Sequence, residues 1–186
     1  MKKFIVRNLC KNYHNLVVVN NFSFEFESGL YLLTGENGKG KSTLLKMFSK
    51  VIKPSNIYYH IDEIDRCFMC ERIEPGSGNV LDYLKRISQY NYVKTNILAL
   101  INKWDIPNKD ISSLSKGNRQ KVAILMTYLC EADLYLFDEP TDALDKKAIK
   151  LFNEYIEELI NLDKIIIIST HEKKYFSKMK YQEVKI

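Results

Sequence analysis

Gly35-Glu36-Asn37-Gly38-Lys39-Gly40-Lys41-Ser42 has the spacing Gly-x-x-x-x-Gly-Lys-Ser, and this stretch predicts the fold of the chain around it. An apolar run from Leu30 to Leu33 leads into it, and a helical pattern from Thr43 to Phe48 follows it. A strand, a glycine-rich loop and a helix in that order form a loop that binds phosphate. The glycines let successive backbone N–H groups point at phosphate oxygens, and the helix adds the positive end of its dipole. The stretch therefore predicts a site for a nucleoside triphosphate.

Two side chains at the end of this loop have separate expected roles. Lys41 is expected to reach the β- and γ-phosphates, and the hydroxyl of Ser42 is expected to bind Mg²⁺. The alternative is a glycine- and lysine-rich surface turn that matches the spacing by chance. The strand and helix patterns on either side argue against that alternative.

Composition indicates an ordinary globular domain. The chain has 186 residues, of which 46% are apolar and 27% charged, enough for a proper core. Its net charge is +5, but Lys and Arg are spread along the chain, so no nucleic-acid partner is expected. No apolar run approaches the ~20 residues of a membrane span, and the apolar stretch after Met1-Lys2-Lys3 is too short for a signal peptide. We therefore expect a cytoplasmic protein.

The cysteines do not predict a metal site. Cys67 and Cys70 form one Cys-x-x-Cys pair, whereas Cys10 and Cys130 are isolated. A zinc site would need a second pair with matching spacing. We interpret Cys67 to Cys70 as a buried strand with reduced thiols.

The apolar patterns predict an α/β fold with two kinds of sheet. Strands are expected at Lys3–Leu9 and Asn21–Glu27, and the second alternates phenylalanine with polar residues, which is typical of an antiparallel sheet with one solvated face. Unbroken apolar runs at Leu134–Phe137 and Ile165–Ile168 are separated by a helix from about Asp145 to Asn161. Such runs are typical of central parallel strands.

The middle of the chain has mainly helical periodicity. Short strands are expected at Ile57–Ile61 and Cys67–Cys70, followed by helical patterns at Asn79–Trp104 and from about Asn118 to Leu129. No repeat or linker interrupts the sequence. We therefore expect one domain, residues 1–186, in which residues 72–118 form a helical insertion in the α/β core.

Two acidic residues at the end of an apolar run predict hydrolysis. Leu134 to Phe137 is followed directly by Asp138 and Glu139. In phosphate-loop proteins a carboxylate at the tip of the neighbouring strand holds Mg²⁺, which suits Asp138. Glu139 can accept a proton from the water that attacks the γ-phosphate. An acidic turn without function is the alternative interpretation.

A third segment, Leu114 to Gln120, opens a helix. Ser115 is the expected N-cap, and a helix N-terminus of this kind can bind an anion. A capped helix start with no ligand is an equally good interpretation of this segment by itself.

Taken together, these segments resemble the nucleotide-binding domain of an ABC ATPase over essentially the whole chain. The Walker A loop corresponds to Gly35–Thr43, and the Walker B strand to Leu134–Asp138 with Glu139 as catalytic base. Leu114–Asn118 matches the family signature Leu-Ser-Gly-Gly-Gln at three of five positions. Ala143–Asp145 matches the D-loop, and His171 matches the switch histidine.

The resemblance implies ATP and Mg²⁺ as cofactors and Glu139 and His171 as catalytic residues. Tyr13 stands where the family places an aromatic ring against adenine. Metal ligands would be Ser42, Asp138 and Glu71. The implied nucleotide-binding set is Tyr13, Gly35, Glu36, Asn37, Gly38, Lys39, Gly40, Lys41, Ser42, Thr43, Glu71, Ser115, Lys116, Gly117 and Asn118.

Three departures from the family pattern stand out. Glu71 occupies the place of a usual glutamine, which adds negative charge near the γ-phosphate. Lys116 and Asn118 replace glycine and glutamine in the signature, so Lys116 brings a positive charge toward the γ-phosphate. The chain also has little sequence after His171, where other members have a regulatory domain.

The resemblance implies the ATPase subunit of a membrane transporter, on the cytoplasmic face of the membrane, with the transmembrane subunit on a separate chain. The Ser-Lys-Gly signature followed by Gln120-Lys121 is similar to exporter subunits. Two copies, or one copy and a related subunit, would dimerise around ATP. Residues Glu71–Tyr92 are expected to dock the transmembrane subunit. A soluble non-transport ABC ATPase, for example of the iron–sulfur assembly type, is the alternative.

Overall fold

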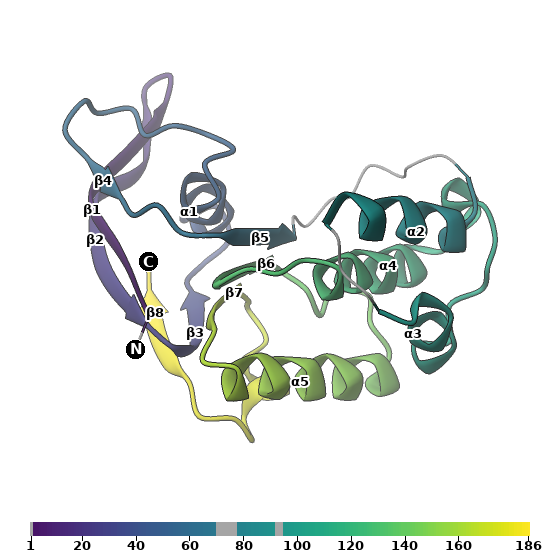
Figure 1. The fold of residues 1–186 in the computed structure, drawn as a ribbon. Helices are drawn as coiled ribbons and strands as arrows, with labels where there is room; N and C mark the ends of the chain where they lie inside the picture. Colours follow the sequence, from purple (N-terminus) through teal and green to yellow (C-terminus); the bar gives the residue numbers. More distant parts are fainter. Residues whose placement is uncertain (1, 70–77, 92–94) are drawn as a thin grey trace.

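Two β-sheets, one antiparallel and one parallel, organise the chain, and helices cover the parallel sheet (Figure 1). The computed structural model describes residues 2–69, 78–91 and 95–186. The predicted α/β class, with a parallel core, an antiparallel N-terminal sheet and helices between the phosphate loop and the signature, is confirmed.

The antiparallel sheet has the order β2-β1-β4, formed by β1 (Lys3–Tyr13), β2 (Leu16–Glu27) and β4 (His60–Ile61). Both long strands extend beyond their predicted ranges toward the hairpin turn that joins them. The predicted strand at Ile57–Ile61 was too long, because Ile57 and Tyr58 are 85% exposed and lie outside any strand. Phenylalanine rings from β1, β2 and α1 pack together on the buried face of this sheet.

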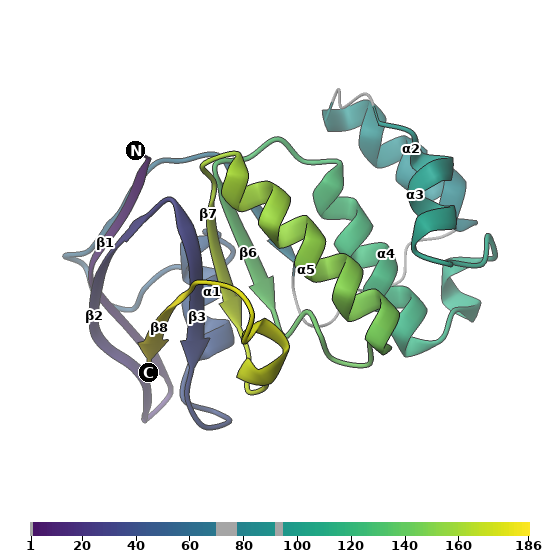
Figure 2. The same cartoon turned by 90° about the horizontal axis from the view of Figure 1, so that it is seen from below.

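The parallel sheet has the order β5-β6-β7-β3-β8, and its neighbouring strands all run parallel. Its strands are β3 (Gly29–Thr34), β5 (Arg66–Met69), β6 (Leu134–Asp138), β7 (Ile165–Ser169) and β8 (Gln182–Lys185). Figure 2 shows β8 beside β3. At the end of this pairing, the backbone N–H of Ile186 donates to the carbonyl of Thr34, directly before the phosphate loop.

Apolar residues on both faces explain why the central strands have no alternation in hydrophobicity. Ile166 and Ile168 of β7 belong to the core on the side of α4 and α5, whereas Ile165 and Ile167 belong to the core on the side of α1. Successive residues of a strand point to opposite faces, so a sheet buried on both sides needs apolar residues throughout. The unbroken Ile165–Ile168 run is the result.

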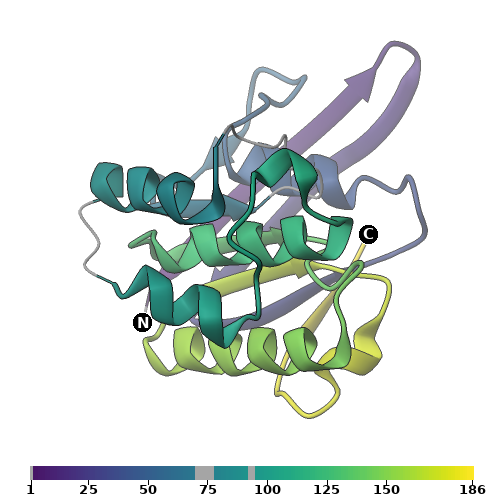
Figure 3. The ribbon, with the colours of Figure 1, turned by 90° about the vertical axis from the view of Figure 1, so that its right-hand side faces the viewer.

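Helix α1 (Lys41–Phe48) lies on one face of the parallel sheet, together with the antiparallel sheet. On the other face lie α2 (Val80–Asn91), α3 (Ile97–Lys103), α4 (Lys116–Tyr128) and α5 (Lys146–Asn161). In Figure 3 these four helices face the viewer with the strands behind them. Short 3₁₀ turns occupy Ile111–Ser113 and Lys173–Phe176.

Two helices lie in the region of predicted helical periodicity at Asn79–Trp104, and the Asn96 side chain caps the second by accepting from the N–H of Ala99. One helix boundary differs from its prediction. Helix α4 begins at Lys116, before the predicted start, because Ser115 is its N-cap and accepts from the N–H of Asn118. When a serine is the N-cap, the first residue of the helix is the one that follows the serine.

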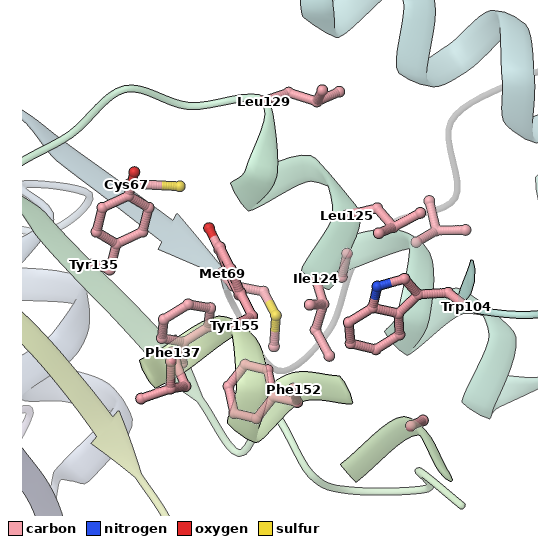
Figure 4. Packing of buried hydrophobic residues seen from close by; sticks show 14 of the residues in the cluster. Cys67, Met69, Trp104, Ile124, Leu125, Leu129, Tyr135, Phe137, Phe152 and Tyr155 are labelled. Carbon is pink, nitrogen blue, oxygen red and sulfur yellow. The ribbon is translucent and has the colours of Figure 1, made fainter. Parts of the chain in front are cut away.

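Aromatic side chains contribute to the core between the helices and the sheet. Figure 4 shows Trp104, which follows α3, beside Ile124 of α4. Phe137 of β6 and Phe152 of α5 meet edge to face with ring centroids 5.2 Å apart. Buried side chains of this kind fix the helices on the sheet and so fix the loops at its edge.

The remaining predictions concern membrane-spanning helices and the cysteine residues. Among the helices of residues 2–69, 78–91 and 95–186, none combines the length and apolar character needed to cross a bilayer. Cys67 is buried on β5 and carries a free thiol, as do the half-buried Cys10 and Cys130. Cys70 lies outside the described residues.

Candidate nucleotide site

The phosphate loop connects β3 to α1. Gly40, the N-cap of α1, has φ 95°, and a Cβ at this position would lie 2.8 Å from the carbonyl oxygen of Val18. Glycine is therefore needed here both for the left-handed backbone and for the close approach of β2. The antiparallel sheet thus packs directly against the loop.

Lys41 points back over the loop that precedes it. The side chain is largely buried, and its Nζ donates to the carbonyl oxygens of Gly35 at 2.9 Å and Glu36 at 3.3 Å. The ammonium group therefore lies against the curled backbone, where a phosphate held by the loop would meet it. The role expected for Lys41 in phosphate binding stays a prediction.

Asp138 is a buried carboxylate at the end of β6. It is 1% exposed and accepts hydrogen bonds from the hydroxyl of Ser42 at 2.9 Å and the hydroxyl of Ser169 at 2.6 Å. A buried charge of this kind needs such donors to offset its lost hydration. The phosphate loop, β6 and β7 each contribute one of the three side chains, because their ends meet at one edge of the sheet.

Glu139 lies one residue beyond the strand and has a different environment. Its backbone is left-handed (φ 47°), its N–H donates to the Ser169 hydroxyl at 3.0 Å, and its Oε2 lies 3.1 Å from Nδ1 of His171. Burial raises the pKa of Glu139, while the charges of His171 and Lys41 oppose that rise. A carboxylate with a raised pKa is better able to take up a proton.

Lys41, Ser42, Glu139 and His171 border one pocket of about 400 Å³. Residues of the phosphate loop line it together with Glu139 and His171. The lining residues are Val18, Asn37, Gly38, Gly40, Lys41, Ser42, Thr43, Glu139, Asp142 and His171. The pocket therefore combines backbone donors, a lysine ammonium, two hydroxyls and a candidate base, which suits a triphosphate and its hydrolysis.

Several predicted residues do not line this pocket, among them Gly35, Glu36, Lys39, Asp138 and Tyr13. Tyr13, at the end of β1, is 45% exposed and absent from the pocket lining, with Nζ of Lys11 lying 5.4 Å from the centre of its ring. Its contact with adenine stays a prediction. Glu71, predicted to bind nucleotide and metal, lies outside the described residues.

The signature residues form a separate cluster at the start of α4. Ser115, Lys116, Gly117 and Asn118 do not line the pocket of the same chain. They contact the segment that follows Glu139 instead, through Lys116 and Asp142 and through the close approach of Gly117 to Ala143. A role in nucleotide binding for these residues stays a prediction.

Three residues of this region were not predicted from the sequence to belong to the site: Val18, Asp142 and Ser169. A signal existed for Ser169, because it is the first polar residue after the apolar run of β7 and pairs in register with Asp138. Residues at the carboxyl ends of adjacent parallel strands lie side by side. Val18 and Asp142 carried no such signal.

A phosphate loop between a strand and a helix, with a buried aspartate and a second acid at the end of another strand of the same sheet, defines a phosphate-loop NTPase. Residues 19–142 match the ABC transporter family. The chain belongs to the ABC transporter family as an ATP-binding subunit. Members of this family bind and hydrolyse ATP.

Alignments with individual relatives extend over most of the chain. An ABC transporter ATP-binding protein from Methanocaldococcus jannaschii is 32% identical, over 91% of this chain and 68% of its own length. The cytochrome c biogenesis ATP-binding export protein CcmA of Reclinomonas americana is 30% identical, over 92% and 86% of the two chains. The zinc uptake ATP-binding protein ZnuC of Bacillus subtilis is 26% identical, over 90% and 83%. A solved ABC transporter ATP-binding protein from Pyrococcus furiosus superposes with a TM-score of 0.81 at 26% identity, covering 99% of this chain and 97% of its own.

Proposed function

We propose that this chain is the Mg²⁺-dependent ATPase subunit of an exporter, and that ATP-driven dimerisation of the chain moves a separate transmembrane subunit. The observation that carries the proposal is the convergence of Lys41, Ser42 and Glu139 on one pocket, with Asp138 bonded to Ser42 behind it. Triphosphate binding, metal binding and proton transfer each have a side chain there.

The hydrolytic step uses Glu139 as general base. Its carboxylate takes the proton of the attacking water, and His171, 3.1 Å away, orients that carboxylate and stabilises its charge. Lys41 stabilises the negative charge that develops on the phosphate oxygens. The products are ADP and inorganic phosphate.

The oxygen ligands at Ser42 and Asp138 fit Mg²⁺. A hydroxyl and a buried carboxylate 2.9 Å apart are hard oxygen donors. No group of three or more His, Cys, Asp or Glu side chains suitable for a metal occurs in the described part of the chain. Mg²⁺ commonly has one or two protein ligands and completes its shell with water and phosphate. When bound, it would neutralise phosphate charge, and Ser42 and Asp138 would hold it.

A dimer would bring the signature to the nucleotide. Ser115 caps α4 without lining the pocket of its own chain, and a helix N-terminus is suited to an anion. In a head-to-tail two-fold dimer, Ser115, Lys116, Gly117 and Asn118 of one chain would close on the triphosphate of the other.

The surface at α2 suits a partner. Tyr83 packs toward α4 and donates to Sδ of Met126 at 3.7 Å, whereas Tyr90 is 85% exposed. Tyr92 and the start of the predicted docking segment at Glu71 lie outside the described residues. We propose that Tyr90 contacts the transmembrane subunit, at the cytoplasmic face of the membrane.

The direction of transport and the role in transport itself are supported by different observations. Export is supported by the Ser-Lys-Gly signature and by the likeness to an export protein, although a relative named for uptake also matches. Transport is supported over a soluble role because these relatives are transporter subunits.

The test uses the Glu139→Gln chain, which should bind ATP without hydrolysing it. We expect ATP with Mg²⁺ to convert this variant from monomer to dimer in sedimentation velocity. A matched sample with ADP should stay monomeric, because ADP lacks the γ-phosphate that the partner's signature would bind. A monomer at saturating ATP, alone and with the transmembrane subunit, would exclude the proposed mechanism.

A further inference from the structure

Lys116 and Asp142 form an ion pair that the sequence alone did not predict. Lys116 is the first residue of α4, and Asp142 follows the strand end that carries Glu139. Nζ of Lys116 lies 2.5 Å from Oδ2 of Asp142, and the two side chains are 68% and 42% exposed. The hydrogen bond from Lys116 lowers the pKa of Asp142, so the carboxyl group stays charged near neutral pH. The pair therefore joins the signature to the segment after β6.

The backbones beneath this pair are packed closely. A Cβ on Gly117 would lie 2.6 Å from the carbonyl oxygen of Ala143, so only glycine fits there. One turn further, Nε2 of Gln120 donates to the two carbonyls that follow β6, at 3.2 and 3.1 Å. The start of α4 is thus firmly held on this segment, while the Lys116–Asp142 pair lies at its exposed edge. The pair can open without disturbing the packing below it.

The charge at the start of α4 favours an anion beside it. The first turn contains Lys116 and Arg119 and no acidic residue. Cations are unfavourable at the positive end of a helix dipole, and a nearby anion relieves this. The carboxylate of Asp142 supplies that anion from outside the helix.

Asp142 also borders the nucleotide pocket, together with Lys41 and His171. It therefore lies between the pocket of its own chain and Lys116. In the proposed dimer Lys116 would face the γ-phosphate of the partner's ATP, which is also an anion and carries more charge. Asp142 and that phosphate would compete for the same ammonium group.

We propose that Asp142 is an internal substitute for phosphate, which holds Lys116 in the single chain and restrains dimerisation. The inference rests on the proposed ATP-driven dimer. Closure of the dimer exchanges the Lys116–Asp142 contact for a contact between Lys116 and the partner's triphosphate. The cost of breaking the internal pair opposes closure, so that the dimer is weaker than it would be without Asp142.

The test measures the dimer dissociation constant at saturating ATP and Mg²⁺, with Glu139→Gln as the parent. Asp142→Asn should tighten the dimer by about two- to fivefold per site, the effect of removing one competing exposed ion pair. Lys116→Gln should weaken it by about tenfold or more, because a charge-assisted contact to phosphate is lost. In the Lys116→Gln background, Asp142→Asn should then have no effect.

The matched control is Glu25→Gln. Glu25 pairs with Lys3 at the same 2.5 Å distance, and with Arg7 at 3.4 Å, in the antiparallel sheet, with the side chains of this cluster exposed. Removing this pair changes the net charge as Asp142→Asn does and should leave the dimer unchanged. ATP affinity of the monomer, measured at low protein concentration, separates nucleotide binding from dimer closure.

Three results would overturn the inference. Equal tightening by Asp142→Asn with and without Lys116 would mean that Asp142 only repels the nucleotide of its own chain. Weakening by Asp142→Asn would mean that Asp142 supports the dimer. A parent that never dimerises would remove the proposed function itself, and the inference with it.

Discussion

The hydroxyl of Ser42 donates a 2.9 Å hydrogen bond to Asp138, although the two residues are far apart in the sequence. Ser42 lies in the first turn of α1, and Asp138 ends β6. The bond connects the phosphate-binding loop to the strand end that carries Glu139. In the proposed mechanism, triphosphate binding and hydrolysis therefore share one edge of the parallel sheet.

Glu139→Gln should lower ATP turnover by the ~10²–10⁴ expected for the loss of a positioned base. ATP binding should remain, because glutamine has the same size and can still contact His171. Phosphate release and ATP binding are measured on the same preparation, in the presence of the transmembrane subunit. Turnover at the wild-type rate would contradict the assignment.

The raised pKa of Glu139 predicts a pH-dependent stability difference. Burial raises this pKa in the folded chain, so the wild-type protein loses stability as the pH rises from the ordinary glutamate range through the raised value. Glutamine does not titrate. The melting temperature of Glu139→Gln should therefore exceed that of wild type above this range and converge with it at lower pH. A difference that is independent of pH would show that burial of the charge is not the cause.

Lys41→Ala should weaken ATP binding by about tenfold or more, since it removes a charge-assisted contact to phosphate. Adenosine binding should change little, because adenosine has no phosphate. Calorimetric titration of both ligands gives the comparison. The exposed Lys178 provides a control, as Lys178→Ala changes the net charge equally. Equal losses for ATP and adenosine would indicate a damaged fold.

Ser169→Ala should destabilise the chain by about 1.5–3 kcal/mol, the usual contribution of a hydrogen bond to a buried charge. Ser169 donates to Asp138 at 2.6 Å and accepts from the N–H of Glu139. Urea unfolding measures the change. Ser177→Ala removes an exposed hydroxyl that donates to a backbone carbonyl, and should stay within about 0.5 kcal/mol of wild type. Similar small effects for both variants would mean that Asp138 does not depend on Ser169.

Tyr90→Glu should abolish binding of the transmembrane subunit and leave ATP affinity unchanged. Tyr90 is 85% exposed on α2, away from the nucleotide pocket. Co-purification with the transmembrane subunit measures binding. Tyr58→Glu is the matched control, because Tyr58 is equally exposed but lies near the antiparallel sheet. Crosslinks from the partner to α5 instead of α2 would show that the docking assignment is wrong.

The sequence by itself determined the phosphate loop, the two acids at the end of β6 and the central strands. These features are local: spacing sets the loop, and an unbroken apolar run such as Ile165–Ile168 reflects burial on both faces of a sheet. The ends of the short strand β4 could not be predicted as well from the sequence. Ile57 and Tyr58 have apolar side chains but no strand partner, and a strand needs one.

Only the tertiary structure decided which distant residues meet. β8 pairs with β3 because the sheet edge needs a partner for its backbone groups, and nothing in its own short pattern required this. Ser169 and Asp138 meet because β6 and β7 pair in register, and Lys116 meets Asp142 because Gly117 lets two backbones touch. Contacts across a fold depend on how the chain packs. The spacing of residues within one segment does not predict these contacts.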